Sequence, residues 1–116
     1  MRWILLLVAC GSSPSNPSPD LAQSSAFTWT SDAQSFFADY CVSCHKPGGQ
    51  AQQQDFSEYD QVVSNAATIR CGVASVMQSG CGSVPAPKQF PIGNGAKPSD
   101  AERDAIVAWI DAGLPQ

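Results

Sequence analysis

The chain has 116 residues, with 43% hydrophobic and 14% charged residues, and a formal net charge of −4 at pH 7. A chain of this length forms one small domain with a modest core. The excess of acidic residues argues against nucleic acid as a partner, because phosphate binding requires lysine and arginine.

The chain begins with features of an exported protein. One basic residue, Arg2, precedes the apolar run 4–9, which is too short to cross a bilayer as a helix, since that requires about 20 residues. We therefore expect a secretory signal peptide over residues 1–9. Residues 7–10, Leu-Val-Ala-Cys, resemble the lipobox of bacterial lipoproteins, in which the cysteine becomes the acylated first residue. An ordinary signal peptide, with Cys10 incidental, is the alternative.

Residues 10–26 are predicted to be a lipidated Cys10 followed by a tether. Ser, Pro, Asn and Gln dominate after Cys10, and such a composition stays disordered and partly extended. A tail without lipid would have the same composition, so only Cys10 distinguishes the two. With this tether we expect a lipid-anchored domain over residues 27–116, on the periplasmic side of a bacterial membrane or at the cell surface.

The first helix of the domain is predicted to start at Thr30 or Ser31, where Ser31 and Gln34 match a capping box. The residues with i, i+3, i+4 and i+7 spacing on one face are Phe37, Tyr40, Cys41 and Cys44. The two cysteines are thus expected to finish this helix, before Lys46–Gly49 ends it.

Cys41, Cys44 and His45 form the Cys-x-x-Cys-His signature for covalent attachment of haem. Two thiols on a short loop can add to the two vinyl groups at one haem edge, and the adjacent imidazole can ligate the iron. His45 is the only histidine in the chain. The motif predicts one covalently bound haem c.

Two other sites use paired cysteines. A thioredoxin-like redox pair is expected in a βαβ context, which the sequence lacks. A zinc site would add Cys71 and Cys81 as ligands, but it gives no reason for a histidine directly after the second cysteine. Export also favours an oxidising compartment.

A second short helix is predicted from Ser57 to about residue 67. The segment 70–97 is rich in Gly and Pro, and we predict no helix there. The residues of this segment expected in the core are Val73, Val76, Phe90 and Ile92.

Cys71 and Cys81 remain once lipid and haem have taken the other three cysteines. Two leftover thiols in an oxidising compartment usually pair, and closing so short a loop contributes about 3 kcal/mol. Two free buried thiols are the alternative to this predicted disulfide.

The last helix has the clearest signals. Ser99 and Glu102 form a second capping box, and Gly113 with Pro115 stops the helix. Its predicted buried stripe consists of Ile106, Trp109 and Ile110, with Val107 at the margin. The domain is therefore predicted to be all-α.

The chain resembles small class I-type cytochromes c, in particular the compact lipoprotein domains of environmental bacteria. The matching residues are 40–45, with an aromatic residue and the haem motif, and 99–102 with 109–113, Ser-Asp-Ala-Glu and Trp-Ile-Asp-Ala-Gly. The resemblance spans roughly residues 27–115. It implies N- and C-terminal helices packed beside the haem, with a loop over the distal face.

The chain departs from that family at the distal ligand. Such cytochromes carry a methionine shortly before the final helix, where this chain has Phe90-Pro91-Ile92. Met77 is the only methionine besides the initiator, so we predict Met77 as the sixth iron ligand. The alternatives are that it fills a core gap, or that Lys88 or Lys97 ligates instead.

Single-electron transfer with redox partner proteins is the expected function, without enzymatic activity. The alternative is a five-coordinate haem protein that binds a small ligand, as a sensor or weak peroxidase, with Phe90 over the iron. The absence of a second histidine argues against evolved peroxide chemistry. A third class is a surface lipoprotein in which haem mainly stabilises an interaction module.

Overall fold

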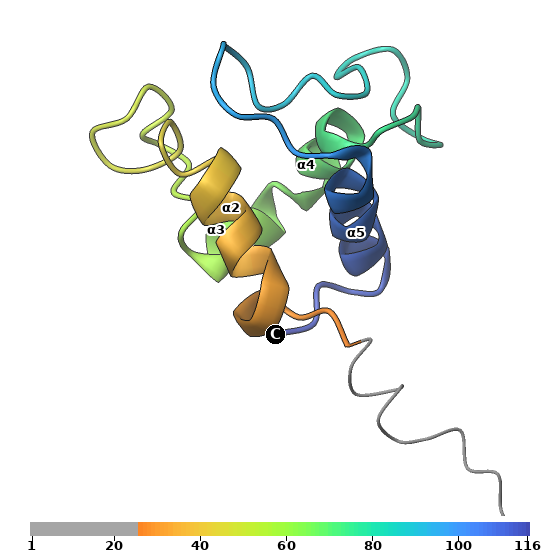
Figure 1. Ribbon diagram of the computed structural model, residues 1–116, viewed down its shortest axis with the longest axis horizontal. Coiled ribbons are helices and arrows are strands. Elements are labelled where there is room, and N and C mark those ends of the chain that lie inside the picture. The colour runs from red at the N-terminus through yellow and green to blue at the C-terminus, as the bar shows by residue number, and fades with distance from the viewer. Residues whose placement is uncertain (1–25) are drawn as a thin grey trace, which may run out of the picture.

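A computed structural model describes residues 26–116 of the chain. The predicted signal peptide 1–9, Cys10 and the tether up to residue 25 lie outside the described residues. Within residues 26–116 the chain is helical and has no strand (Figure 1), so the all-α prediction is confirmed at the level of fold class. None of the helices in this range combines the length and apolar character that a bilayer span requires.

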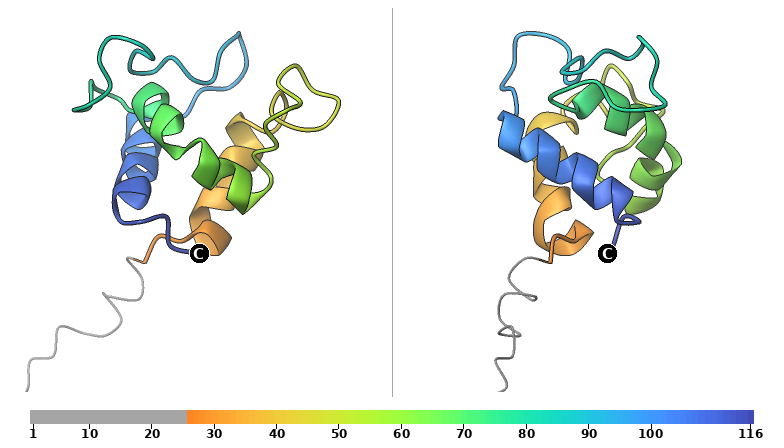
Figure 2. Two further views of the ribbon diagram at one scale, coloured as in Figure 1. Left: turned by 180° about the vertical axis from the view of Figure 1, so that it is seen from behind. Right: turned by 90° about the vertical axis from the view of Figure 1, so that its right-hand side faces the viewer.

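The helical segments are all short. In chain order they are η1, a π-helical turn at Trp29–Ala33, then α2 at Gln34–Tyr40, α3 at Tyr59–Ser64, α4 at Ala66–Val73 and α5 at Asp100–Asp111. Two long connections, 41–58 and 74–99, therefore form much of the domain. In Figures 1 and 2 both connections extend from the end of the molecule opposite the C-terminus.

The first helical segment starts earlier than predicted. Its cap is Thr28, whose Oγ1 accepts a hydrogen bond from the Ser31 N–H at 3.1 Å, while the Ser31 hydroxyl accepts one from the Thr28 N–H at 3.2 Å. A cap at Thr30 or Ser31 was the wrong prediction, because the first turn is a π-helix joined directly to α2. Cys41 caps the C-terminus of α2, so the two motif cysteines follow the helix, and the prediction that they finish it was wrong.

The region predicted as one helix from Ser57 contains two. α3 ends at Ser64, Asn65 interrupts the helical backbone, and α4 continues through Val73 into the segment predicted to lack helix. Gly72 lowers the intrinsic helix propensity there. Tertiary packing overrides that weak preference, because the Phe90 ring packs directly over the Gly72 backbone.

The last helix begins and ends as predicted, but its buried face differs: Val107 is buried and Ile110 only partly so, the reverse of the prediction. The Glu102 N–H donates to Ser99 Oγ at 3.1 Å, and the Ser99 N–H donates to Glu102 Oε1 at 3.0 Å, which confirms the capping box. Ile106 and Trp109 are buried. Gly113 then adopts a φ of 97°, a left-handed conformation that glycine reaches without strain and that ends the helix.

An aromatic cluster at the centre of the core joins three helical segments. Trp29 of η1, Phe37 of α2 and Trp109 of α5 have ring centroids 5.8 to 6.3 Å apart. Such pairs contribute about 0.5–1.5 kcal/mol each beyond the area they bury. Of the core residues predicted in the Gly- and Pro-rich segment, Val73 is buried and Phe90 partly so. Val76 and Ile92 are 63% and 73% exposed, and the prediction was wrong for them.

The C-terminus closes the domain beside its first helical turn. The backbone N–H groups of Trp29 and Thr30 donate to the carbonyls of Pro115 and Gln116 at 2.8 and 3.2 Å. The indole of Trp109 also donates to the Pro115 carbonyl, at 2.9 Å. α2 thus begins next to the C-terminus and runs toward the opposite end of the molecule, where its last residue leads into the Cys-x-x-Cys-His motif (Figure 1).

Candidate functional site

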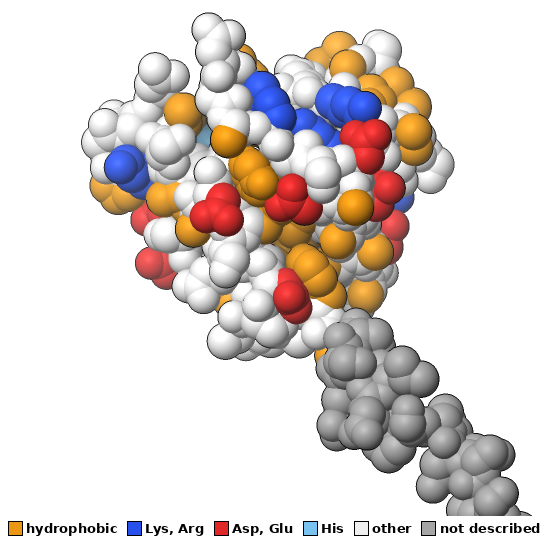
Figure 3. Space-filling view, in the orientation of Figure 1, with side chains coloured by type: hydrophobic (Ala, Val, Ile, Leu, Met, Phe, Trp, Pro, Cys, Tyr) orange, Lys and Arg blue, Asp and Glu red, His pale blue; other side chains and the backbone are white. Residues whose placement is uncertain are grey.

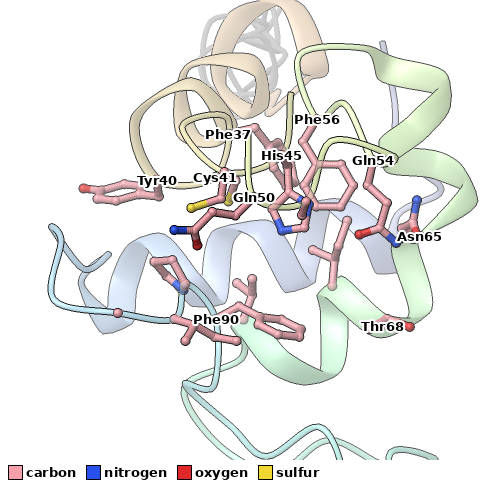
Figure 4. A pocket seen from close by; sticks show the side chains of 17 residues that line it. Phe37, Tyr40, Cys41, His45, Gln50, Gln54, Phe56, Asn65, Thr68 and Phe90 are labelled. Atoms are coloured by element: carbon pink, nitrogen blue, oxygen red, sulfur yellow. Dashed lines mark hydrogen bonds between the residues drawn. The ribbon is translucent and has the colours of Figure 1, made fainter. Parts of the chain in front are cut away.

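A cavity of about 400 Å³ lies between the Cys-x-x-Cys-His motif and α4. This volume is within the range of small-molecule and cofactor sites. Figure 4 shows His45 and Phe56 on one wall and Phe90 on the wall facing them. The cavity therefore gathers residues from both long connections around α4.

The two motif cysteines both line this cavity and are free thiols. The N–H groups of Cys44 and His45 donate to the Cys41 carbonyl at 3.2 and 2.9 Å, so one tight turn brings all three residues to the same wall. Burial, reinforced by neighbouring Cys44, raises the pKa of the Cys41 thiol to about 12, against an opposing effect of Arg103. At neutral pH the Cys41 thiol is therefore protonated.

The imidazole of His45 is held flat against Phe56, with ring centroids 4.2 Å apart and an interplanar angle of 16°. The Phe56 N–H donates to the His45 carbonyl at 2.9 Å and fixes the two residues together. Burial lowers the pKa of His45, and the Gln54 backbone partly offsets that effect. The ring is therefore neutral at physiological pH, the form in which histidine ligates metals.

One nitrogen of this ring has no hydrogen-bond partner. Nδ1 of His45 is buried and makes no hydrogen bond of normal geometry within residues 26–116, although the Gln54 backbone lies close enough to the ring to act on its pKa. An unsatisfied buried polar atom costs about 1–3 kcal/mol, and in a native protein it calls for an explanation. Two reduced thiols and an unpaired neutral imidazole on one apolar wall fit the donor set for a covalently attached haem.

The same donor set does not fit a zinc site. Cys71 and Cys81 are joined in a disulfide, so neither thiol is available as a ligand. The part of the chain that the structure describes contains no group of three or more His, Cys, Asp or Glu side chains arranged to hold a metal ion. A structural zinc ion needs four such ligands.

The wall opposite His45 is mainly apolar. Ile69 and Val73 of α4 line it together with Phe90, Pro91 and Ile92.

The structure does not bring Met77, the predicted sixth ligand, to this cavity. Met77 is 51% exposed and lies outside the cavity lining. Lys88 and Lys97 also lie outside it. Lys88 pairs with Asp100 at 3.1 Å, and the Lys97 ammonium donates to the Pro91 carbonyl.

Sequence reasoning missed several polar residues of the site. Gln54 and Asn65 line the cavity, and the Gln54 side chain donates to Asn65 Oδ1 at 2.9 Å. Thr68, one turn further along α4, also lines it. Gln54 comes from the connection 41–58, Asn65 from the α3–α4 junction and Thr68 from α4, so only the tertiary structure brings them together, and no motif marks them in the sequence.

Arg103 was missed although a signal was present. It lies three residues before Ile106 and therefore on the buried stripe of α5, and its side chain is only 3% exposed. Its guanidinium Nη1 donates to the carbonyls of Val73 at 2.9 Å and Phe90 at 2.7 Å. A charged residue at a buried helical position is the pattern that could have revealed it.

Comparison with known proteins yields no relative. No family model, curated protein or solved structure matches the chain. The residues of the cavity and their chemistry are therefore the basis for a functional assignment.

Proposed function

We propose that the chain is a monohaem c-type cytochrome that transfers single electrons. The observation that carries this proposal is that Cys41, Cys44 and His45 line one cavity, with both thiols free and the imidazole nitrogen unpaired. A bound haem supplies an iron that alternates between two oxidation states. In this proposal the thiols form thioether bonds to haem, and His45 is an iron ligand.

The residues around the motif have supporting roles. Phe56 stacks on the imidazole and fixes its orientation, and burial keeps the ring neutral and able to ligate. Phe37, Ile69 and Val73 give the cavity apolar walls that exclude water. An apolar, water-poor site is one of the means by which a protein controls a haem potential.

Redox partner proteins are the proposed partners, and basic residues flank the cavity. Lys46 follows the motif, while Lys88 and Lys97 flank the Phe90 segment. On the face seen in Figure 3, the basic side chains lie toward the end with the long connections, and acidic side chains are scattered beside and below them among apolar and uncharged ones. Such an arrangement steers an acidic partner toward the cavity.

Export and lipid anchoring through Cys10 are part of the same proposal. Cys10→Ser should release the haem protein from the membrane fraction into the soluble extract. Unchanged retention of the variant in washed membranes would contradict an acyl anchor at this residue.

Haem attachment is tested by expressing the chain with a c-type maturation system and measuring mass and visible absorption after denaturation. The wild type should retain one haem. Cys41→Ser with Cys44→Ser should retain none, because no thioether can form. Ser43→Ala changes an exposed residue of the same turn and should match the wild type. A colourless wild-type protein with the mass of the polypeptide alone would overturn the proposal.

A second candidate function is the binding of a small ligand such as carbon monoxide or nitric oxide at five-coordinate iron. It is favoured by the exposed position of Met77 and by the apolar wall opposite His45. If this is correct, the reduced protein binds carbon monoxide rapidly, and Met77→Ala leaves the rate and spectrum unchanged. Loss of the methionine-to-iron absorption band in Met77→Ala would instead establish Met77 as the ligand and favour electron transfer.

A further inference from the structure

Arg103 is a buried cation. Neither electron transfer nor ligand binding at the motif requires it directly. Within residues 26–116 the ion pairs are Arg70 with Asp111 and Lys88 with Asp100, so no carboxylate pairs with Arg103. Burying a charge is costly unless hydrogen bonds or an opposite charge compensate it. A buried guanidinium without a carboxylate partner therefore calls for an explanation.

The hydrogen bonds of Arg103 connect three parts of the molecule. The residue belongs to α5, and its Nη1 donates both to Val73, the last residue of α4, and to Phe90. The final carbonyls of a helix lack partners within the helix and favour a positive charge. The Phe90 carbonyl belongs to the segment 88–92, which we call the Phe90 strap.

The backbone of the Phe90 strap is also bonded to the end of α4. The Phe90 N–H donates to the Gly72 carbonyl at 3.1 Å, and the Lys88 N–H donates to the Ala74 carbonyl at 2.9 Å. A Cβ on Gly72 would lie 2.3 Å from Phe90 Cδ2, so the ring rests directly on the helix backbone. Arg103 supplies a further attachment of the strap, and it joins the strap to α5 from within the core. At the exposed start of the strap, Lys88 also pairs with Asp100 of α5 at 3.1 Å.

This attachment positions the wall that faces His45. Phe90 lines the cavity, and Figure 4 shows it across the cavity from the imidazole. If the strap were released from Arg103, the Phe90 ring would lose its buried attachment to α5 and water could enter beside it, while the exposed pair of Lys88 with Asp100 would remain. The buried charge also acts on the cavity itself, since a nearby cation favours the less positive, reduced state of a metal centre.

We propose that Arg103 is a positioning residue that holds Phe90 as the wall opposite His45 and, through its buried charge, raises the reduction potential of the group bound there. The part concerning potential rests on the proposed haem function. The part concerning the strap does not, because it follows from the hydrogen bonds of the polypeptide.

Two variants of Arg103 separate the two effects. Arg103→Met removes both the charge and the hydrogen bonds, whereas Arg103→Lys keeps the charge but ends one bond short of the Nη1 that bonds both carbonyls. Amide exchange at Phe90 should be about tenfold faster in Arg103→Met, as expected for loss of a charged hydrogen bond. In the same variant, the ratio of oxidised to reduced protein at a fixed solution potential should rise about tenfold. This corresponds to a reduction potential lowered by ~59 mV for one electron. Arg103→Lys should show faster exchange with a potential near that of the wild type.

Arg70→Met provides the matched control, because it removes an arginine that contacts Asp111 and lies outside the cavity. It should leave both Phe90 exchange and potential unchanged. If Arg103→Met folds poorly, Arg103→Gln serves instead, because it also removes the charge but keeps a polar amide at the buried position, and the same two changes are expected.

Wild-type exchange and wild-type potential in Arg103→Met would overturn the inference. Absorbance of the same preparations shows whether the wild-type protein carries haem. A wild type without haem would overturn the proposed function. The exchange measurement would still decide whether Arg103 holds the strap.

Discussion

The two walls of the cavity are built in different ways. The wall with His45 comes from one short stretch, in which a single turn after α2 and local backbone bonds place Cys41, Cys44 and His45 together. The facing wall is assembled from α4 and the Phe90 strap and is held by bonds between residues up to 30 positions apart, such as Arg103 with Val73. The residues proposed to attach a cofactor are thus brought together by neighbouring sequence, while the cavity around them depends on contacts between distant segments.

This difference has a consequence for mutations. Changes in the local wall should abolish attachment of a cofactor without unfolding the domain. Changes in the assembled wall, or in α5, which supports both walls, should alter stability and enclosure while leaving the attachment residues intact. The following predictions test that division, starting with α5.

Trp109→Ala should cause the largest loss of stability. The indole is 1% exposed, packs against Trp29 and Phe37, and bonds to the Pro115 carbonyl. Removing a buried Trp costs roughly 3–5 kcal/mol. Urea unfolding followed by circular dichroism measures the change, with Trp109→Phe as the control that keeps most of the packing. Equal stability of Trp109→Ala and the wild type would contradict this description of the core.

Replacing both Cys71 and Cys81 by Ser should lower the free energy of unfolding by about 3 kcal/mol, because the unfolded chain is no longer constrained by the crosslink. Neither cysteine lines the cavity, so haem attachment should persist. Adding a reductant to the wild type provides the comparison, since it should reproduce the stability loss. If the double variant lost its haem while remaining folded, the separation of this loop from the site would be wrong.

Gly72→Ala should destabilise the protein through the Phe90 ring. The new methyl group meets Phe90 Cδ2 at 2.3 Å, and overpacking of this kind costs about 1–3 kcal/mol. In a Phe90→Ala background the clash disappears, so the same substitution should become stabilising by up to about 1 kcal/mol through helix propensity. Thermal unfolding of the four proteins in this cycle measures the coupling.

Gly95→Ala is the matched control for Gly72→Ala, because a Cβ at Gly95 meets no atom within 4 Å. It should leave the melting temperature close to that of the wild type. Additive effects of Gly72→Ala and Phe90→Ala would contradict direct packing between the two residues.

The smallest effect concerns Glu102, which links α5 to α2. The Ser99 N–H and then the Tyr40 hydroxyl lower the pKa of the Glu102 carboxyl below its usual value of 4.5. A depressed folded-state pKa contributes stability above the unfolded-state pKa, and this contribution is lost as pH falls through the folded-state value. The wild type should therefore lose stability below about pH 4.5 more steeply than Glu102→Gln.

Stability curves between pH 6 and pH 3 test this, with Glu58→Gln as a control for removing an exposed carboxyl. Parallel curves for the wild type and Glu102→Gln would show that the bonds from Ser99 and Tyr40 do not contribute in solution.

Local signals explain which parts of the fold could be predicted from sequence. The capping box of Ser99 and Glu102 and the stop at Gly113 identified α5, because caps and left-handed glycines depend on neighbouring residues only. α4 was missed because Gly72 disfavours a helix locally. Glycine suits this position because the Phe90 ring occupies the space that a side chain would need, and that contact is not visible in the sequence. The start of η1 was missed because a π-helical turn does not follow the usual 3.6-residue period.

The same distinction applies to the candidate site. The motif from Cys41 to His45 could be found because its chemistry requires a fixed spacing. The opposite wall could not, since no spacing relates Phe90 to Val73 or Arg103. Met77 was chosen for its thioether and its place on the loop between Cys71 and Cys81, and neither property reports that its side chain is half exposed and outside the cavity lining. Haem binding itself, and the cytochrome c-like arrangement it implies, stay predictions.

The bonds from Trp29 and Thr30 to Pro115 and Gln116 fix where the domain can be connected to anything else. Entry and exit of the polypeptide share one pole, and α2 carries the chain from there to the thiols at the other. A fusion partner, an affinity tag or an acylated leader would all be joined at that pole. Each of them would be attached at the opposite end of the domain from the end of α2 that leads into the motif.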